Sequence, residues 1–372
     1  MYIRDPVLQE IHATSDEERI IDTNEFQRLR RVSQLGFANL VYPGATGTRF
    51  EHSLGTMRIT KDLSINLYGK IDPELSVAGL LHDVGHTPYS HATEPVFMHR
   101  LRKTHEQLGR DMIMAGPLHD AIQDSSLSLK KVLSGFDGNG KGTIITGPLG
   151  SDRLDYLMRD AYQTGVAYGI IDYVRIKNRL AYRNGKPAIY LNGVDGAESM
   201  LIARYYMLSS VYFHHTSVIA SSMFNKALDA CISSGEIDPK EAARFEDLRL
   251  SEALLHSKPG SKLAKDVEER KLFKRAYYID SLDVDLKKGE LESALGHAGL
   301  DYNDYVVEIN HFKGGHDDIM VIDKDGSRMG LLSKISPLFN ALLGMLSRRS
   351  IVLAACEPVN VARARIALRK AL

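Results

Sequence analysis

Histidines and acidic residues gather in one part of the chain, and their side chains could hold a metal ion. Six of the fourteen histidines lie between His52 and His105, and His82 and Asp83 stand side by side after an apolar stretch. Burying an imidazole beside a carboxylate is costly unless a cation compensates. His52 and His82 offer two imidazoles, and Asp83 and Asp152 offer two carboxylates. That donor set suits one divalent ion: Mn, Fe, Co, Ni or Zn, and Mg less well.

Three predicted helices must bring these four donors together. Asp72 is a natural N-cap and Pro73 fits the first helical position, so a helix begins there. Its apolar spacing predicts a buried helix that ends at Gly85 and carries the His-Asp pair in its closing turn. A second helix begins within residues 48–55, and a third begins within residues 151–152. The predicted fold is therefore mostly α.

The rest of the chain changes character near residue 235. Residues 1–235 are expected to form one helical domain, and residues 236–372 a C-terminal region of helices and a small sheet. Asn184-Gly185 predicts a hairpin between two short strands. Strands are also predicted at 305–309, 318–322 and 350–355, a long helix or helix pair at 197–231, and a charged helix at 258–274. The Gly-rich stretch 134–143 predicts a flexible loop.

Composition excludes several classes of protein. Forty-seven basic and 47 acidic residues give zero formal charge, which argues against a general nucleic-acid or membrane-surface binder. The two cysteines, Cys231 and Cys356, match no zinc or disulfide pattern and favour a reducing cytoplasm. No apolar run approaches the ~20 residues of a membrane span. We expect a cytoplasmic protein without a membrane partner.

The ordered motifs resemble those of the HD-domain phosphohydrolases, in the deoxynucleoside triphosphate triphosphohydrolase branch. The matching segments, all within residues 1–230, are Phe26–Arg30, Gln34–Gly36, Thr48–Gly55, His82–His91, Thr104–Glu106 and Asp152–Asp160. Many relatives carry an acidic residue just before the last metal ligand, where this chain has Gly150-Ser151. The resemblance implies an HD-domain helical bundle with a small α/β C-terminal appendage. It also implies a homo-oligomer, a dimer or tetramer, that cuts a deoxynucleoside triphosphate to deoxynucleoside and triphosphate.

The resemblance assigns catalytic roles to further residues. His86, His91 and His105 would lie near the scissile phosphate, and one of them would protonate the leaving oxygen, because imidazole titrates near the working pH. Glu106, and also Glu94, could orient these rings by accepting an N–H bond.

Substrate contacts follow from position and from the resemblance. Arg49 lies one helical turn before His52 and so can face the same site, where its fork suits phosphate oxygens. By resemblance, the other contacts are Arg153 and Arg204 for phosphate, Tyr156 and Tyr212 for sugar and base, Asp160 and Gln34 for the 3′-hydroxyl, and Leu35 against a 2′-hydroxyl.

Some alternatives stay open at this point. The substrate could be another nucleotide (a monophosphate, a cyclic or a modified one) or a phosphodiester. A module that senses nucleotide without turnover is disfavoured, because the ligands and the catalytic histidines are all present. Arg28, Arg30 and Arg31 either bind a regulatory nucleotide at a subunit interface or form a solvated helix face, and we favour the solvated face.

Overall fold

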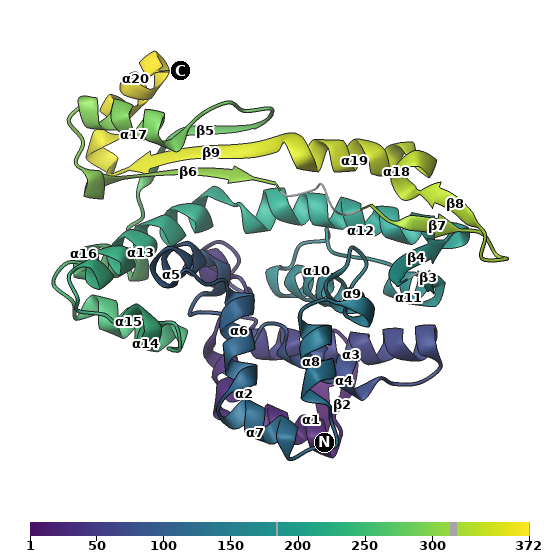
Figure 1. The fold of residues 1–372 in the computed structure, drawn as a ribbon. Coiled ribbons are helices and arrows are strands. Elements are labelled where there is room, and N and C mark those ends of the chain that lie inside the picture. The colour runs from purple at the N-terminus through teal and green to yellow at the C-terminus, as the bar shows by residue number, and fades with distance from the viewer. Residues whose placement is uncertain (184, 313–317, 372) are drawn as a thin grey trace.

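The computed structural model describes residues 1–183, 185–312 and 318–371 and is mostly helical, as the sequence predicts (Figure 1). A short antiparallel ribbon opens the chain, made of β1 (Tyr2–Asp5) and β2 (Gln9–His12). The helices that follow are α1 (Ser15–Ile21), α2 (Asn24–Arg28), α3 (Arg49–Tyr68), α4 (Pro73–Leu81), α5 (Glu94–Leu101), α6 (His105–Met114), α7 (Pro117–Gln123), α8 (Leu129–Phe136), α9 (Thr143–Thr146), α10 (Ser151–Thr164) and α11 (Tyr173–Arg179).

Helix α3 is the centre of this part of the molecule and packs against both α4 and α10. The buried side chains of these helices include Leu54, Met57, Leu80 and Leu157, each at most 3% exposed. Burial of apolar surface is the main favourable term in folding, so this shared core fixes the three helices relative to one another. They are the elements that were predicted to carry the metal ligands.

Helix α4 begins as predicted but ends earlier. The side chain of Asp72 accepts a hydrogen bond from the backbone N–H of Leu75 at 3.3 Å. The helix ends at Leu81, not at the predicted Gly85. A Cβ atom at Gly85 would lie 2.1 Å from the carbonyl oxygen of His105, so the chain leaves the helix where it passes α6.

Two long helices cross the molecule between the lower helical part and the sheet drawn at the top of Figure 1. These are α12 (Val194–Met207) and α13 (His215–Ser233), so the predicted helix pair is confirmed. A π-helical turn at Leu208–Tyr212 joins them. Such turns recur at functional sites, and this one carries Tyr212.

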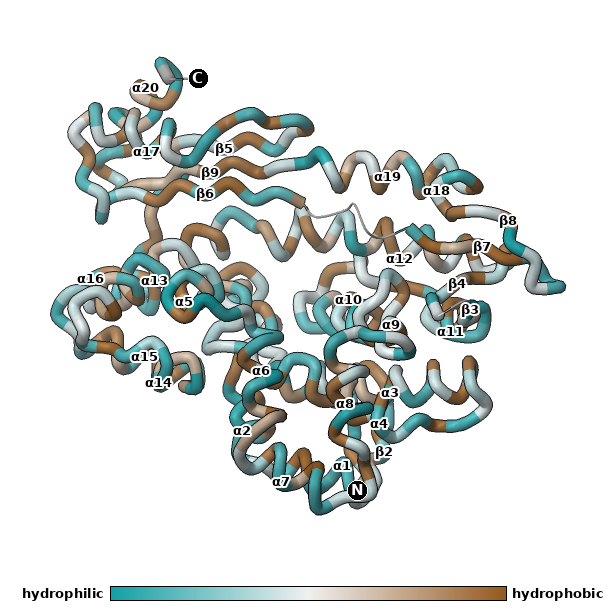
Figure 2. The backbone as a smooth tube through the Cα atoms, in the orientation of Figure 1, coloured by the Kyte–Doolittle hydropathy of each residue, from teal (hydrophilic) through white to brown (hydrophobic). Residues whose placement is uncertain are grey.

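The strands form two sheets beyond the N-terminal ribbon, where the sequence predicts one small sheet. In the first sheet β9 (Arg349–Cys356) lies between β5 (Lys274–Leu282) and β6 (Tyr305–His311), all antiparallel. Hydrophobic residues occupy much of β6 and β9 themselves (Figure 2). The second sheet has the order β3 (Leu180–Arg183), β4 (Lys186–Tyr190), β7 (Met320–Ile322) and β8 (Arg328–Leu331).

The second sheet contains the predicted hairpin. Strands β3 and β4 pair antiparallel, with Arg183 opposite Lys186, while Asn184 lies outside the described residues. Strand β4 also pairs in parallel with β7, so this sheet joins residues on both sides of residue 235. The division of the chain at that residue stays a prediction.

The remaining helices are α14 (Pro239–Ala242), α15 (Asp247–Leu255), α16 (Ser261–Glu268), α17 (Lys288–His297), α18 (Leu332–Ile335), α19 (Pro337–Arg348) and α20 (Val361–Ala371). One helix prediction is wrong at its C-terminal end. The helix expected over 258–274 is only α16, because Lys274 already begins β5 and pairs with β9. The loop expected over 134–143 is present but shorter, because α8 extends to Phe136 and α9 begins at Thr143.

Within the described ranges, no helix combines the length and the apolar character that a membrane crossing requires.

Candidate metal centre and active site

The four predicted metal ligands converge from three helices. His52 comes from α3, His82 and Asp83 follow the end of α4, and Asp152 lies in the first turn of α10. The Nε2 atom of His52 lies 3.2 Å from that of His82, 3.4 Å from Asp83 Oδ2 and 3.2 Å from Asp152 Oδ1. The Nε2 atom of His82 lies 3.4 Å from Asp83 Oδ2 and 3.6 Å from Asp152 Oδ1.

The donor set fits one divalent cation. Ligands at about 2.0–2.2 Å from an ion lie about 3.0–3.6 Å from one another, which matches these separations. His52 Nδ1 is 2.8 Å from Asp155 Oδ2, and His82 Nδ1 is 2.8 Å from the carbonyl oxygen of Gly79. Those acceptors assign the proton of each neutral ring to Nδ1, so two Nε2 lone pairs face each other beside two carboxylates. A cation removes that repulsion.

The pKa values of these groups also indicate that the site favours a positive charge. Burial alone would lower the pKa of His82, but Asp83 and Asp152 raise it to about 10. Burial opposes charge on Asp152 as well, yet the two imidazoles hold its pKa below the ordinary value. A bound cation would supply the positive charge that the raised pKa of His82 otherwise draws from a proton.

Asp155 supports the predicted metal centre through its hydrogen bond with His52. It is fully buried, and Arg159 binds both of its oxygens at 2.8 Å. Arg159 also donates to Asp5 Oδ2 at 2.8 Å, which ties this group to the N-terminal ribbon. Asp155 and Arg159 are four residues apart, so their pairing lies within one helical turn of α10. The sequence does not reveal that Asp155 orients the ring of His52, 103 residues earlier.

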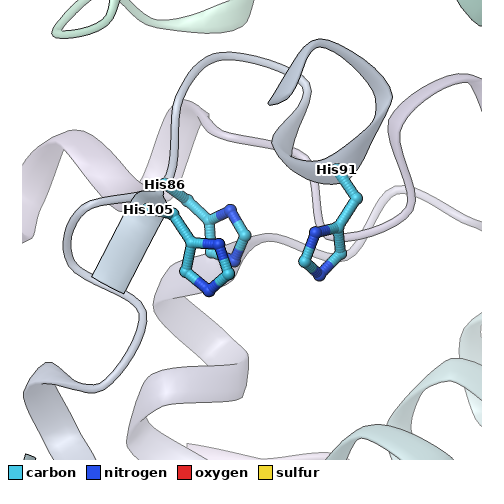
Figure 3. A group of neighbouring side chains, drawn as sticks. All are labelled: His86, His91 and His105. Carbon is cyan, nitrogen blue, oxygen red and sulfur yellow. The ribbon is translucent and has the colours of Figure 1, made fainter. Parts of the chain in front are cut away.

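The three predicted catalytic histidines form a second group beside the metal ligands (Figure 3). The rings of His86 and His105 stack with their centroids 4.0 Å apart, and the ring of His91 stands at 90° to that of His86. Glu94 accepts from both outer rings, at 2.5 Å from His105 Nδ1 and 2.7 Å from His91 Nδ1. One carboxylate therefore orients two imidazoles and leaves their Nε2 atoms available.

The two stacked histidines have opposite charge preferences. Burial would lower the pKa of His105, but Glu94 holds it above the ordinary value. Burial, together with Arg49 and His105, holds the pKa of His86 well below its ordinary value. Both ring nitrogens of His86 are buried without a hydrogen-bond partner, although Nε2 lies 3.3 Å from Asp83 Oδ1. Of the two rings, that of His105 therefore has the greater tendency to hold a proton.

Glu106 and Arg49 occupy different positions around this group. The carboxylate of Glu106 is 61% exposed and lies 3.4 Å from His105 Nε2, whereas that of Glu94 is 19% exposed and is the more buried partner of the ring. The guanidinium of Arg49 is 4% exposed and donates to Asp83 Oδ2 at 2.5 Å and to Ser90 Oγ at 2.8 Å. Its positive charge is therefore fixed at the edge of the ligand set.

The site opens into a cavity of about 1180 Å³. Its lining combines three predicted groups. They are the metal ligands Asp83 and Asp152, the catalytic residues His91, His105 and Glu106, and the substrate contacts Gln34, Leu35, Arg49, Tyr156, Asp160, Arg204 and Tyr212. Arg153 follows the ligand Asp152 on α10, and both Arg153 and Arg204 oppose the burial-driven rise in the pKa of Tyr156. Positive charge thus lies beside the aromatic wall of the cavity.

Polar groups of the cavity wall are held in defined positions. The hydroxyl of Tyr212 donates to Asp160 Oδ2 at 2.9 Å, and the rings of Tyr156 and Tyr212 are 6.2 Å apart. Burial raises the pKa of Asp160 to about 7, against the opposing effect of Tyr212. The Oε1 atom of Gln34 is buried without a partner, so an incoming hydroxyl or amide could satisfy it.

The solvated-face interpretation is wrong for Arg28. This side chain is 8% exposed and donates to the carbonyl oxygens of Val84, His86 and Phe245. Arg30 and Arg31 are exposed, Arg30 over the ring of Phe50 at 3.6 Å and Arg31 paired with Glu246 at 2.6 Å. Nothing local in the sequence distinguishes the buried arginine from its two neighbours.

The arrangement agrees with comparisons to known proteins. Residues 49–115 match the family model described as HD domain, and residues 171–351 match that described as HD associated region. A crystal structure of a hypothetical protein from Aquifex aeolicus superimposes with a TM-score of 0.84, at 30% identity, over 99% of both chains. An uncharacterised protein of Methanocaldococcus jannaschii is 38% identical over 76% of this chain and 60% of its own length.

Two of the relatives have an activity in their names. The human deoxynucleoside triphosphate triphosphohydrolase SAMHD1 is 40% identical over 119 residues, which are 28% of this chain and 19% of that protein. The chain spans 54–60% of the length of the first four curated relatives. The family match, the shared fold and the converging histidines and aspartates place this chain in the HD-domain phosphohydrolase family, whose HD domains bind divalent metals.

Proposed function

We propose that this chain hydrolyses deoxynucleoside triphosphates to deoxynucleoside and triphosphate. One observation carries the proposal: a single cavity is lined by Asp83 and Asp152, by His91 and His105, and by the predicted sugar, base and phosphate contacts. The similarity to the human enzyme of that activity supports the same reading of the site.

Each group in the site has a chemical task in this reaction. A divalent ion held by His52, His82, Asp83 and Asp152 would supply Lewis acidity toward a phosphate oxygen and lower the pKa of water. Arg49, with Arg153 and Arg204, places fixed positive charge where the triphosphate would carry several negative charges.

The leaving group is the 5′-oxygen of the deoxynucleoside. Water adds to the α-phosphorus, the bond from that phosphorus to the 5′-oxygen breaks, and the oxygen must gain a proton. His105 is the donor in this proposal because Glu94 raises the pKa of its ring above the ordinary value, which favours the protonated form. His86, kept neutral by burial and by Arg49, lies against the donor without competing for its proton.

The sugar would be selected by three other residues of the cavity lining, Gln34, Leu35 and Asp160. Asp160, already an acceptor from Tyr212, would accept from the 3′-hydroxyl, and the buried Oε1 of Gln34 has capacity for another donor. Leu35 offers an apolar surface that leaves a 2′-hydroxyl without a partner, and burying an unpaired hydroxyl is costly.

The test is a substrate panel with the purified protein and Mn²⁺, Fe²⁺, Co²⁺, Ni²⁺, Zn²⁺ or Mg²⁺ in turn. Four deoxynucleoside triphosphates are compared with their ribose counterparts, with deoxynucleoside monophosphates, with cyclic nucleotides and with a short oligonucleotide. We expect the deoxynucleoside triphosphates to be turned over fastest. Equal rates on ribose substrates, or activity only on monophosphates, cyclic nucleotides or the oligonucleotide, would contradict the proposal.

A variant separates sugar selection from general damage. Asp160→Asn should reduce the preference for a substrate with a 3′-hydroxyl over its 2′,3′-dideoxy counterpart, since it changes the proposed acceptor of that hydroxyl. Tyr162→Phe, on the exposed face of the same helix, is the matched control and should leave the preference unchanged.

A further inference from the structure

The turn from His86 to His91 carries two of the three catalytic histidines, and we call it the catalytic turn. Two of its residues have backbone angles that non-glycine residues rarely adopt: φ is 60° at Tyr89 and 55° at Ser90. Such angles persist where surrounding contacts determine them, and they concentrate at functional sites. The contacts that determine them here come largely from residues distant in sequence.

Asp247, the first residue of α15, holds the middle of the catalytic turn. Its Oδ1 atom accepts from the backbone N–H of Tyr89 at 2.6 Å, and its Oδ2 atom accepts from the backbone N–H of Ser33 at 2.9 Å. In the same helix, Ser251 lies 2.7 Å from the hydroxyl of Tyr89. Ser90 Oγ in turn donates to the carbonyl oxygen of Ser33 at 2.7 Å, so Asp247 holds Tyr89 directly and Ser90 through Ser33.

Arg28 holds the start of the catalytic turn. Its Nη2 atom donates to the carbonyl oxygens of Val84 at 3.1 Å and His86 at 2.7 Å. Its Nη1 atom donates to the carbonyl oxygen of Phe245 at 3.0 Å, two residues before Asp247. The planar fork of arginine can reach three fixed carbonyls, which a lysine ammonium on a flexible stem cannot do with the same precision.

We infer that Asp247 and Arg28 are positioning residues that hold the catalytic turn, so that residues beyond position 235 complete the active site. Neither side chain touches the proposed substrate. Asp247 fixes the backbone next to His91, and Arg28 fixes the backbone at His86. The inference rests on the proposed function only for its activity readout, because the clamp itself is a set of contacts that can be measured without substrate.

The experiment compares Asp247→Ala and Asp247→Asn with the control Glu246→Gln. The control removes the ion pair with Arg31, which joins the same two parts of the chain without a hydrogen bond to the catalytic turn. Amide hydrogen exchange is followed for residues 84–93, with bound metal, kcat and KM measured on the same samples. Asparagine retains one acceptor oxygen, so it should rescue part of the effect and keep the variant folded.

We expect Asp247→Ala to raise exchange in residues 84–93 and to lower kcat by about 10²-fold, because a misplacement of about 1 Å costs that much. KM and metal content should change by less than about threefold, within what intact substrate binding allows. Asp247→Asn should fall between the alanine variant and wild type, and Glu246→Gln should match wild type.

Three results would overturn the inference. One is unchanged exchange and kcat in Asp247→Ala. Another is loss of metal in both Asp247 variants, which would make Asp247 a support of the metal ligands. The third is an equal effect of Glu246→Gln, which would assign the effect to general contact between the two parts. If wild type turns over no nucleotide, the proposed function fails, while the exchange data still decide whether the clamp exists.

Discussion

At the scale of single residues, the site is arranged so that charge and proton position are defined before substrate arrives. Glu94 binds the Nδ1 atoms of His91 and His105, and Asp155 binds that of His52. In each case a carboxylate sets which nitrogen carries the proton and which faces the cavity. Each of these histidines is therefore positioned by a carboxylate partner, and each histidine–carboxylate pair can be tested by substitution.

The role of His105 can be separated from that of the metal ligands. His105→Ala should keep bound metal and near-normal substrate binding, while turnover falls by about 10²–10⁴, the range for loss of a general acid or base. Metal analysis and single-turnover rates on one preparation measure both quantities. His119→Ala on α7 is the control. An unchanged rate would show that His105 carries no proton in the reaction, and joint loss of metal and rate would make it a ligand.

Asp160 should make stability depend on pH near neutrality. Its pKa is about 7 in the folded protein against 3.8 ordinarily, because burial disfavours its charge. An acid with a raised folded pKa contributes stability that is present at low pH and is lost as pH rises through the folded pKa. Wild type should therefore lose stability relative to Asp160→Asn between about pH 4 and pH 7, the range between the ordinary and the folded pKa. Urea unfolding of the metal-free proteins checks this, and parallel curves would refute it.

At the scale of elements, the close passage of α6 over the end of α4 positions His105 beside His86. The passage depends on Gly85, where a Cβ atom would lie 2.1 Å from the carbonyl oxygen of His105 and 2.2 Å from the backbone nitrogen of Gly109. Both are backbone atoms, so a side chain at residue 85 can be accommodated only if α6 moves.

Gly85→Ala should therefore destabilise the protein by about 1–3 kcal/mol, the usual cost of overpacking, and reduce turnover because His105 moves with α6. The matched control is Gly296→Ala in α17, where no atom lies within 4 Å of the added methyl group. That change should be neutral or stabilising, since alanine favours a helix over glycine. Thermal unfolding of the two variants would contradict the account if both shifted in the same direction.

The elements that could be predicted from sequence are those defined by local signals. The cap at Asp72, the apolar spacing after it and the ordered motifs were enough to predict α4 and to name donors that the fold brings together. The early end of α4 was not predictable, because it results from contact with α6. Arg28 and Asp247 act across 58 and 158 residues respectively, and no short-range pattern marks them.

At the scale of the whole molecule, both parts of the chain contribute to one cavity. Its lining extends from the metal-facing carboxylates along α13 to α17 and β6, so helices from the first part and a sheet from the second enclose it. The homo-oligomer expected from the family resemblance stays a prediction. The metal, in contrast, can be tested on the whole protein with one substitution.

His82→Ala should remove both the bound metal and the activity while the protein remains folded. Two imidazoles and two carboxylates hold the ion, and removal of one imidazole leaves an incomplete set. Mass spectrometry measures the metal content of the variant, and circular dichroism checks that it remains folded. His119→Ala again serves as control, and stoichiometric metal in His82→Ala would show that the ligand set is wrong.

The central claim is that water attacks the α-phosphorus of a deoxynucleoside triphosphate in a metal-dependent reaction. It is tested most directly by running the metal-loaded protein in ¹⁸O-labelled water and identifying the products by ³¹P NMR and mass spectrometry. The account predicts one label in the released triphosphate, none in the deoxynucleoside, and no turnover after the metal is removed. Release of orthophosphate or pyrophosphate, label in the deoxynucleoside hydroxyl, or unchanged turnover without metal would contradict it.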